Sequence, residues 1–141
     1  MTENIRPLTA RDGRKKEDAP MFYITGDTHG DFRRYYDFMA QQKPTEQDTM
    51  IVLGDAGLNF YGNEIDERKK DFVNSFPFTT FCVHGNHEMR PANIPTYKIR
   101  EYCGGIVWYE EQYPRIQFAK DGEAVSYTHL DVYKRQDVKR R

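Results

Sequence analysis

Three short and largely apolar runs stand out along the first two thirds of the chain. They cover residues 21–24, 50–53 and 78–83, and each is followed within two residues by a glycine. Runs of this length, bounded by turn residues, are typical of strands buried on both faces, as in a parallel sheet. The pattern therefore predicts three core strands.

Between the first two runs, apolar side chains recur with the spacing of a helix. The predicted helix has Asp31 as its N-cap and ends near Gln42, because the residue before Pro44 avoids the helical conformation. Its apolar side would consist of residues three or four positions apart: Phe32, Tyr35, Tyr36 and Met39. We interpret this side as part of the core rather than as a platform for stacking bases.

A second helix is predicted between the second and third runs. Asn63 can cap it, acidic residues occupy its first turn, and Pro77 closes it. Its buried side would consist of Ile65, Phe72, Val73 and Phe76. Strand and helix thus alternate with a repeat of roughly 30 residues, the length of one βαβ unit. We therefore expect an α/β fold with a right-handed parallel βαβαβ core.

The pattern is weaker after the third run. Residues 92–105 are predicted to form a loop with a short helical turn, and residues 106–109 and 115–119 to form strands. Asp121-Gly122 is a strong hairpin-turn signal. A hairpin at this point needs a partner strand that begins near residue 124.

The N-terminal segment is polar and charged and shows neither a helical nor a strand period. Two interpretations are open: residues 1–20 form a disordered arm, or translation really starts at Met21. Neither assigns a function to the segment. The predicted domain covers residues 21–123.

Residues 124–141 do not have the character of native sequence. Val125–Gln136 is similar to the translation of two transposon mosaic ends joined head to head, as used in tagmentation sequencing libraries. Such scars are set aside before the fold is considered. We therefore expect a domain whose C-terminal hairpin is cut short by a non-native tail. Alternating residues of that tail, at Val125, Tyr127 and His129, are able to pair as a fortuitous strand.

Charge and composition narrow the class of protein. The predicted domain carries more Asp and Glu than Lys and Arg, which argues against nucleic-acid binding and suits a carboxylate-lined metal site. Cys82 and Cys103 lie far apart, without the spacing of a zinc knuckle, so free thiols are expected. Apolar runs of membrane-spanning length and a signal peptide are both missing. We expect a cytoplasmic protein without a membrane partner, and the oligomeric state stays open.

Residues with metal-binding side chains follow all three predicted strands. They lie in three glycine-flanked segments, which contain Asp27 and His29, Asp55, and Asn86 with His87. The carboxyl ends of parallel strands meet at one edge of a sheet, where open α/β folds bind their ligands. One Asp after one strand is commonly a helix cap, but three strand ends together favour a shared site. Carboxylate, amide and imidazole groups gathered in this way suit a divalent metal ion.

In that order, the segments resemble the D-x-H, G-D-x-x and G-N-H-[DE] blocks of the calcineurin-like metallophosphoesterase superfamily. The resemblance covers about residues 21–123. It implies a metallophosphoesterase sandwich, here truncated, and a hydrolase that acts on a small phosphorylated substrate, either a phosphomonoester or a phosphodiester. It also implies two divalent metal ions from the set Mn²⁺, Fe²⁺ or Fe³⁺, Zn²⁺ and Ni²⁺.

The resemblance implies a role for each of these residues. Asp27 and His29 would bind the first ion, Asn86 would bind the second, and Asp55 would bridge the two. A hydroxide between the ions would attack phosphorus, because metal ions lower the pKa of bound water. His87 would donate a proton to the leaving oxygen or stabilise the negative charge that develops on it.

Other residues near these segments have less specific assignments. Glu88 is predicted to orient an imidazole. Arg90 has two open alternatives, contact with the substrate phosphate or a surface salt bridge. Candidates for lining a pocket lie in the loop after the second run: Asn59, Phe60 and Tyr61.

The sequence departs from the family pattern in its histidines. Family members supply one further histidine from a later strand and two from a Gly-His-x-His motif. Here the histidines are His29, His84, His87 and His129, and His84 is expected to be structural. The second ion would therefore keep only Asp55 and Asn86, so we expect impaired activity. The alternative is a non-catalytic α/β fragment with residual metal binding.

Overall fold

The computed structural model describes residues 5–7, 20–83, 85, 88–121, 124–127 and 130–133, the last two ranges by their backbone alone. The strands are β1 (Arg6–Pro7), β2 (Phe22–Thr25), β3 (Thr49–Leu53), β4 (Thr79–Val83), β5 (Tyr97–Tyr102), β6 (Gly105–Glu110), β7 (Tyr113–Ala119), β8 (Ala124–Tyr127) and β9 (Leu130–Tyr133). The described helices are α1 (Arg34–Gln42) and α2 (Glu64–Asn74), with a 3-10 helix at Pro91–Asn93.

Strands β1 to β7 form one sheet in the order β1-β2-β3-β4-β7-β6-β5. β2, β3 and β4 run parallel, with Tyr23 opposite Met50 and Met50 opposite Thr80. β7 adds a fourth parallel strand beside β4, and β6 and β5 continue the sheet antiparallel. The prediction of a mixed α/β fold with a parallel core is confirmed. The chain leaves β2, β3 and β4 at the same edge of the sheet.

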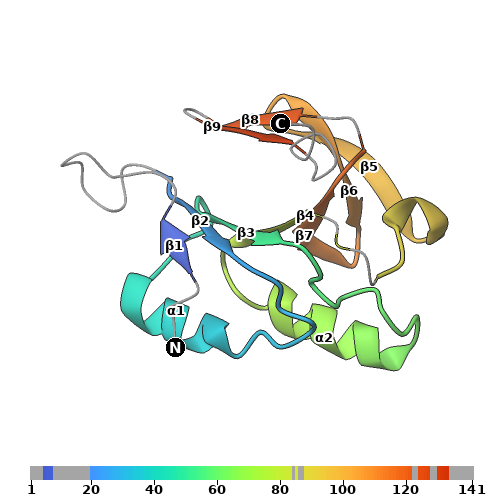
Figure 1. The fold of residues 1–141 in the computed structure, drawn as a ribbon, viewed down its shortest axis with the longest axis horizontal. Coiled ribbons are helices and arrows are strands. Elements are labelled where there is room, and N and C mark those ends of the chain that lie inside the picture. Colours follow the sequence, from blue (N-terminus) through green and yellow to red (C-terminus); the bar gives the residue numbers. More distant parts are fainter. Residues whose placement is uncertain are drawn as a thin grey trace.

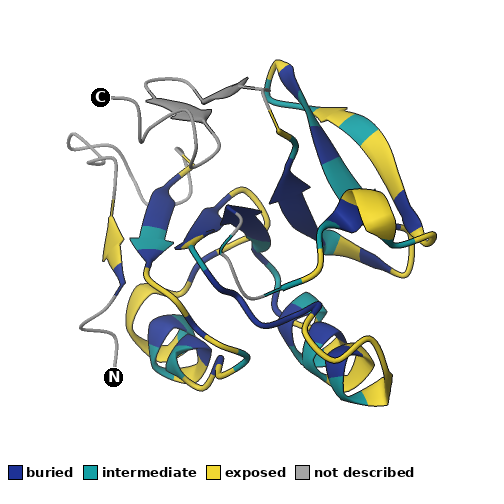
Figure 2. Ribbon diagram, turned by 45° about the vertical axis from the view of Figure 1, so that its right-hand side comes forward, coloured by how far each residue is buried: buried dark blue, intermediate teal, exposed yellow. Residues whose placement is uncertain are grey.

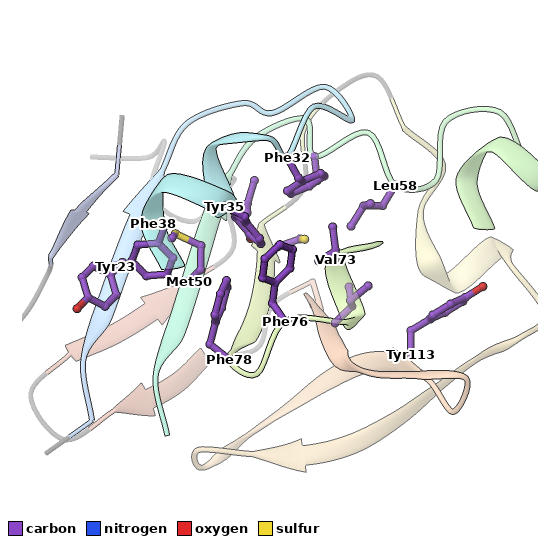
Figure 3. Packing of buried hydrophobic residues seen from close by; sticks show 14 of the residues in the cluster. Tyr23, Phe32, Tyr35, Phe38, Met50, Leu58, Val73, Phe76, Phe78 and Tyr113 are labelled. Atoms are coloured by element: carbon purple, nitrogen blue, oxygen red, sulfur yellow. The ribbon is translucent and has the colours of Figure 1, made fainter. Parts of the chain in front are cut away.

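Both helices cover the same face of the parallel strands (Figure 1). The main core lies between them and the sheet, and it is rich in aromatic rings that meet edge to face (Figure 3). The ring centroids of Phe38 and Phe78 are 5.1 Å apart, and those of Phe38 and Tyr23 are 4.7 Å apart. Each such pair adds roughly 0.5–1.5 kcal/mol beyond the burial of its area. These contacts fix α1 on β2.

α1 begins later than predicted. Asp31 accepts a hydrogen bond from the N–H of Arg33 at 3.1 Å, but Arg33 is itself the N-cap and the helix starts at Arg34. The N–H of Tyr35 donates to Phe32 O three residues back, so the chain enters the helix through a tighter turn. Asp31 therefore caps that turn and not the helix.

The predicted buried side of α1 is confirmed at Phe32, Tyr35 and the partly buried Met39, but it is wrong at Tyr36. Tyr35 and Phe38 are fully buried, whereas Tyr36 is 61 % exposed. The tighter first turn shifts which residues face the sheet, because side chains on a helix advance by 3.6 residues per turn. The predicted end at Gln42 is confirmed, with Lys43 in the left-handed conformation at the C-cap.

α2 follows its prediction closely at both ends. Asn63 Oδ1 accepts a hydrogen bond from the N–H of Ile65 at 2.9 Å, and the helix ends at Asn74, before Pro77. Val73 lies in the core, as predicted. Two charged residues, Asp66 and Lys70, are buried on the same helix, which the apolar pattern did not indicate.

The opposite face of the sheet carries a second apolar cluster, formed by Phe22, Ile51, Phe81, Val83, Val107 and Ala119. These residues alternate with those that face the helices, as the two-residue period of a strand requires. Figure 2 shows the central strands buried, in dark blue, and the outer sides of the helices exposed. The β8–β9 ribbon lies on this face, close to β6 (Figure 1).

Residues 97–102 are a strand, where the sequence predicts a loop. The predicted short helical turn is present at Pro91–Asn93, but β5 follows it and pairs antiparallel with β6. Most side chains of β5 are exposed or half-buried, so the strand has no apolar pattern of its own. Its pairing is decided by the hairpin turn, in which Cys103 and Gly104 have φ of 50° and 80°. Two consecutive positive φ angles are the signature of a type I′ turn.

The strand predicted after Asp121 exists but has a different partner. β7 has β4 on one edge and β6 on the other, so a further strand has no free edge of β7 to join. β8 therefore pairs antiparallel with β9. The prediction that the strand beginning near residue 124 pairs with residues 115–119 is therefore wrong. Gly122 and His129 lie outside the described residues.

A short strand also lies within the N-terminal segment, where the sequence predicts none. β1 pairs antiparallel with β2, and Ile5 joins the main core. The prediction of an unstructured arm is therefore wrong at residues 5–7, because an exposed edge of β2 offers backbone partners that a local pattern does not reveal. In the described part of the chain, no helix is long and apolar enough to cross a membrane.

Candidate metal centre

The carboxyl edge of the parallel strands gathers three side chains that can bind a metal ion. Asp27 and His29 follow β2, and Asp55 follows β3; one ligand atom of each lies within 4.8 Å of the other two. His29 Nε2 lies 3.5 Å from Asp27 Oδ2. Asp55 is only 7 % exposed, whereas Asp27 and His29 face the solvent. Two carboxylates and one imidazole at this spacing fit the ligand chemistry of a small divalent cation.

Backbone hydrogen bonds hold the turns after β2 and β3 against each other. The N–H groups of Thr28 and His29 donate to Asp55 O at 3.1 and 2.8 Å, and the N–H of Gly30 donates to Ala56 O at 2.7 Å. His29 has a φ of 50°, a left-handed conformation that is unfavourable for a residue with a side chain. These bonds hold it there, and the strain places the imidazole next to the two carboxylates.

Glycine is required at two points where the backbone runs against a ligand. A Cβ at Gly54, whose φ is +101°, would collide with the carboxylate of Asp27, and one at Gly85 would collide with that of Asp55. Neither contact leaves space for any other residue. Gly54 and Gly85 therefore allow the backbone to pack directly against the two carboxylates and hold them in place.

Glu88 braces the loop that follows Asp55. Its Oε2 accepts hydrogen bonds from the N–H groups of Ala56 and Gly57 at 2.8 and 3.4 Å. Burial raises the pKa of the Glu88 carboxyl, the backbone donors oppose this rise, and the charge of Asp55 adds to it. The predicted contact of Glu88 with an imidazole stays a prediction, because His84 and His87 lie outside the described residues.

Among the remaining predicted site residues, the structure describes Arg90. Asn86 and His87 lie outside the described residues, so their roles stay predictions. Arg90 Nη1 contacts both carboxylate oxygens of Asp121 at 3.0 Å. This is the surface salt bridge, one of the two alternatives that the sequence leaves open for Arg90.

A cavity of about 210 Å³ opens directly beside the candidate metal ligands. It is lined by His29, Asp55, Gly57, Phe60, Tyr61 and Lys69. Two of the predicted pocket residues, Phe60 and Tyr61, are thus confirmed as lining residues. Asn59 is not among them; it is buried and donates to the hydroxyl of Tyr97 at 2.9 Å.

The cavity wall is supported by a buried polar network. Asp66 accepts hydrogen bonds from the N–H groups of Tyr61 and Gly62 at 3.2 and 2.6 Å, so α2 holds the loop that carries the aromatic pair. One helical turn further, Lys70 Nζ lies 2.7 Å from Glu110 Oε1 on β6, and both side chains are buried.

Sequence reasoning missed the two lysines of α2 as tertiary contacts. Lys69 lines the cavity and Lys70 forms the buried pair with Glu110. One signal was available: Asp66, Lys70 and Val73 are spaced four and three residues apart, which places a lysine on the buried side of the helix. No comparable signal marks Lys69.

The chain matches the family model of the calcineurin-like phosphoesterases over residues 20–138, and it belongs to this family. The resemblance seen in the sequence motifs is thereby confirmed. No curated protein and no solved structure matches the chain. The family is one of phosphoesterases.

Proposed function

We propose that the chain is a metal-dependent phosphoesterase whose active site is the carboxyl edge of β2, β3 and β4. The observation that carries the proposal is the convergence of Asp27, His29 and Asp55 within 4.8 Å in a member of the calcineurin-like phosphoesterase family. Exposed acidic groups also cluster without a function, but this group comes from two strand ends and includes a buried carboxylate and a strained histidine.

In this proposal Asp27, His29 and Asp55 hold one divalent ion, and Asp55 with Asn86 holds a second. Bound divalent ions supply positive charge for the phosphoryl oxygens and lower the pKa of water. Asp55 suits the shared position because it is the most buried of the three described ligands and lies between the other motifs on β3, the middle strand. His87 serves as the proton donor to the leaving oxygen, a role that depends on the motif alone.

The two ions differ in how many ligands the chain offers. Three side chains are available for the first ion and two for the second. We therefore propose that one ion binds firmly, that the second binds weakly, and that turnover is low because it requires both. Residues 124–141, which we propose to be non-native, add no described ligand.

The proposal is tested by titrating the chain with Mn²⁺ in a calorimeter and by assaying p-nitrophenyl phosphate at saturating Mn²⁺. Asp55→Asn is expected to abolish both binding and turnover. The matched control is Glu46→Gln, an exposed carboxylate in the loop before β3, which is expected to change neither. His87→Asn is expected to lower turnover by about 10²–10⁴-fold while Mn²⁺ affinity is retained.

A second candidate is an α/β domain that binds metal without catalysis. It is favoured by the shortage of ligands for the second ion. Mn²⁺ binding that depends on Asp55, without any turnover at saturating metal, is the result that selects this candidate. Turnover that disappears in Asp55→Asn rejects it.

A further inference from the structure

We propose that the cavity beside the metal ligands is a leaving-group subsite for a small aryl phosphate monoester. Phe60 and Tyr61 contact the aromatic ring of the substrate, and Lys69 contacts its phosphate. The inference rests on the proposed phosphoesterase function and adds the substrate class to it.

The cavity has the position and size of a leaving-group subsite. His29 and Asp55 form one side, so a phosphoryl group at the metal ligands places its substituent inside the cavity. A volume of about 210 Å³ lies below the roughly 300–1,000 Å³ typical of drug-sized ligands. It therefore suits a small ester better than a polymer or a dinucleotide.

Two large apolar side chains that line the cavity are partly exposed. Phe60 and Tyr61 are 52 % and 53 % exposed, and their ring centroids lie 4.9 Å apart in an edge-to-face pair. Met89, which is 40 % exposed, approaches the same loop: a Cβ at Gly62 would lie 3.1 Å from its Cε. Large apolar side chains gathered at the mouth of a polar site indicate an apolar ligand group.

Hydrogen bonds within the chain hold the loop that carries these rings, so its shape does not depend on a ligand. Asp66 binds the N–H groups of Tyr61 and Gly62, and the N–H of Met89 donates to Asn59 O at 2.9 Å. A preorganised aromatic wall loses little entropy when a planar group packs against it. Aromatic packing on this wall therefore discriminates between aryl and alkyl esters.

Lys69 supplies a positive charge at the same cavity. Its Nζ lies 5.4 Å from the centroid of the Tyr61 ring, and within the described part of the chain it forms no ion pair. Its neighbour Arg68 is not among the residues that line this cavity, and Arg68 Nη1 lies 3.9 Å from Glu64 Oε1 on the helix surface. A monoester carries two negative charges near pH 8 and a diester carries one. A further cation beside the metal ligands thus favours the monoester.

The test uses two ligands that cannot be hydrolysed, phenylphosphonate and methylphosphonate, so that binding is read without turnover. Their affinities for the full chain are measured by calorimetry with and without Mn²⁺. Phenylphosphonate is expected to bind about tenfold more tightly, since the subsite buries its ring. Phe60→Leu and Tyr61→Leu are expected to remove most of this preference and to leave methylphosphonate binding within about twofold.

Two matched controls separate the subsite from general surface effects. Tyr36→Leu removes an exposed aromatic ring on α1 outside the cavity and is expected to leave the preference unchanged. Lys69→Gln is expected to weaken both ligands about tenfold, whereas Arg68→Gln on the same helix changes neither. An unchanged phenyl preference in both leucine variants overturns the aromatic part, and equal effects of Lys69→Gln and Arg68→Gln overturn the role of the lysine.

Failure of the proposed function gives a different result. If Mn²⁺ does not bind through Asp55, the phosphoesterase proposal fails, and the ligands are then compared on the metal-free chain. A phenyl preference that still depends on Phe60 and Tyr61 supports the subsite by itself. No binding of either phosphonate at any metal concentration overturns the subsite.

Discussion

Two acidic regions of the molecule are built in opposite ways. At the carboxyl edge of the sheet, two carboxylates, Asp27 and Asp55, lie together with the imidazole of His29. At the junction of α2 with the β5–β6 hairpin, one carboxylate, Glu110, lies 2.7 Å from the ammonium group of Lys70. The charges at the junction balance each other, whereas negative charge accumulates at the edge.

The comparison indicates a structural role for the junction and a ligand-binding role for the edge. Thr96 donates a hydrogen bond to the second oxygen of Glu110, and Lys70 lies 5.2 and 5.7 Å from the ring centroids of Tyr97 and Tyr113. Every partner there is supplied by the chain, so the junction needs no ligand. At the edge, like charges are held together by backbone bonds and glycine contacts, an arrangement that a bound cation stabilises.

The largest expected effect comes from breaking the junction. Lys70→Met leaves Glu110 buried without its cation, which is expected to lower the free energy of unfolding by about 3–5 kcal/mol. The measurement is urea unfolding followed by circular dichroism. The control is Lys98→Met, since Lys98 pairs with Glu111 at 3.0 Å on the surface. That exposed pair is expected to contribute little, because solvent screens its charges. Equal losses in the two variants would show that the buried pair is not structural.

At the edge of the sheet, we expect bound metal to raise the free energy of unfolding. A metal ion at a concentration one hundred times its Kd is expected to raise the free energy of unfolding by about 2.7 kcal/mol, because it binds only the folded chain. Thermal unfolding with and without Mn²⁺, and after addition of a chelator, measures this gain. The gain should vanish in Asp55→Asn and persist in Glu46→Gln. A gain that survives in Asp55→Asn would place the ion elsewhere.

The glycine contacts at the edge are tested by Gly54→Ala. The methyl group would collide with Asp27 and the positive φ adds strain, so we expect a loss of about 1–3 kcal/mol and weaker Mn²⁺ binding. Gly104→Ala is the matched control, because Gly104 also has a positive φ but open space around it. It should lower stability without changing Mn²⁺ affinity. Unaltered metal affinity in Gly54→Ala would contradict the role of Asp27 as a ligand.

The smallest effect on stability is expected at the exposed ion pair of Asp31 and Arg33. The side-chain hydrogen bonds from Arg33 hold the pKa of Asp31 well below its usual range. A lowered pKa in the folded chain means that the pair stabilises above the usual pKa of Asp and that this contribution is lost as the pH falls below it. Both side chains are largely exposed, so solvent screens the pair and its contribution to stability is small. Unfolding of Asp31→Asn between pH 7 and pH 2 measures it, and a difference that grows towards low pH would contradict the sign.

The parts of the fold that the sequence revealed are those with a local pattern. The apolar runs identified β2, β3 and β4, and Asn63 and Pro77 marked the limits of α2, because burial and capping act on neighbouring residues. β1 and β5 have no such pattern. Each is a short edge strand whose backbone is satisfied only by a partner distant in sequence, and no window of residues records that partner.

The candidate site divides in the same way. Asp27, His29 and Asp55 were found from motifs at strand ends, since a parallel sheet brings strand ends together. Lys69 was not found, because its place at the cavity depends on how α2 packs against the turn that contains Gly30.

The sequence by itself determined the class of the fold, its ligand-bearing strand ends and the family to which the chain belongs. These features follow from short-range burial and from spacing along one βαβ unit. The tertiary structure alone decided which acidic side chains lie together and which one is paired with a buried lysine. The pairing of Lys70 with Glu110 joins elements forty residues apart. Long-range packing, and not local preference, brings these two side chains together. It therefore also decides which acidic group is structural and which is a candidate for binding metal.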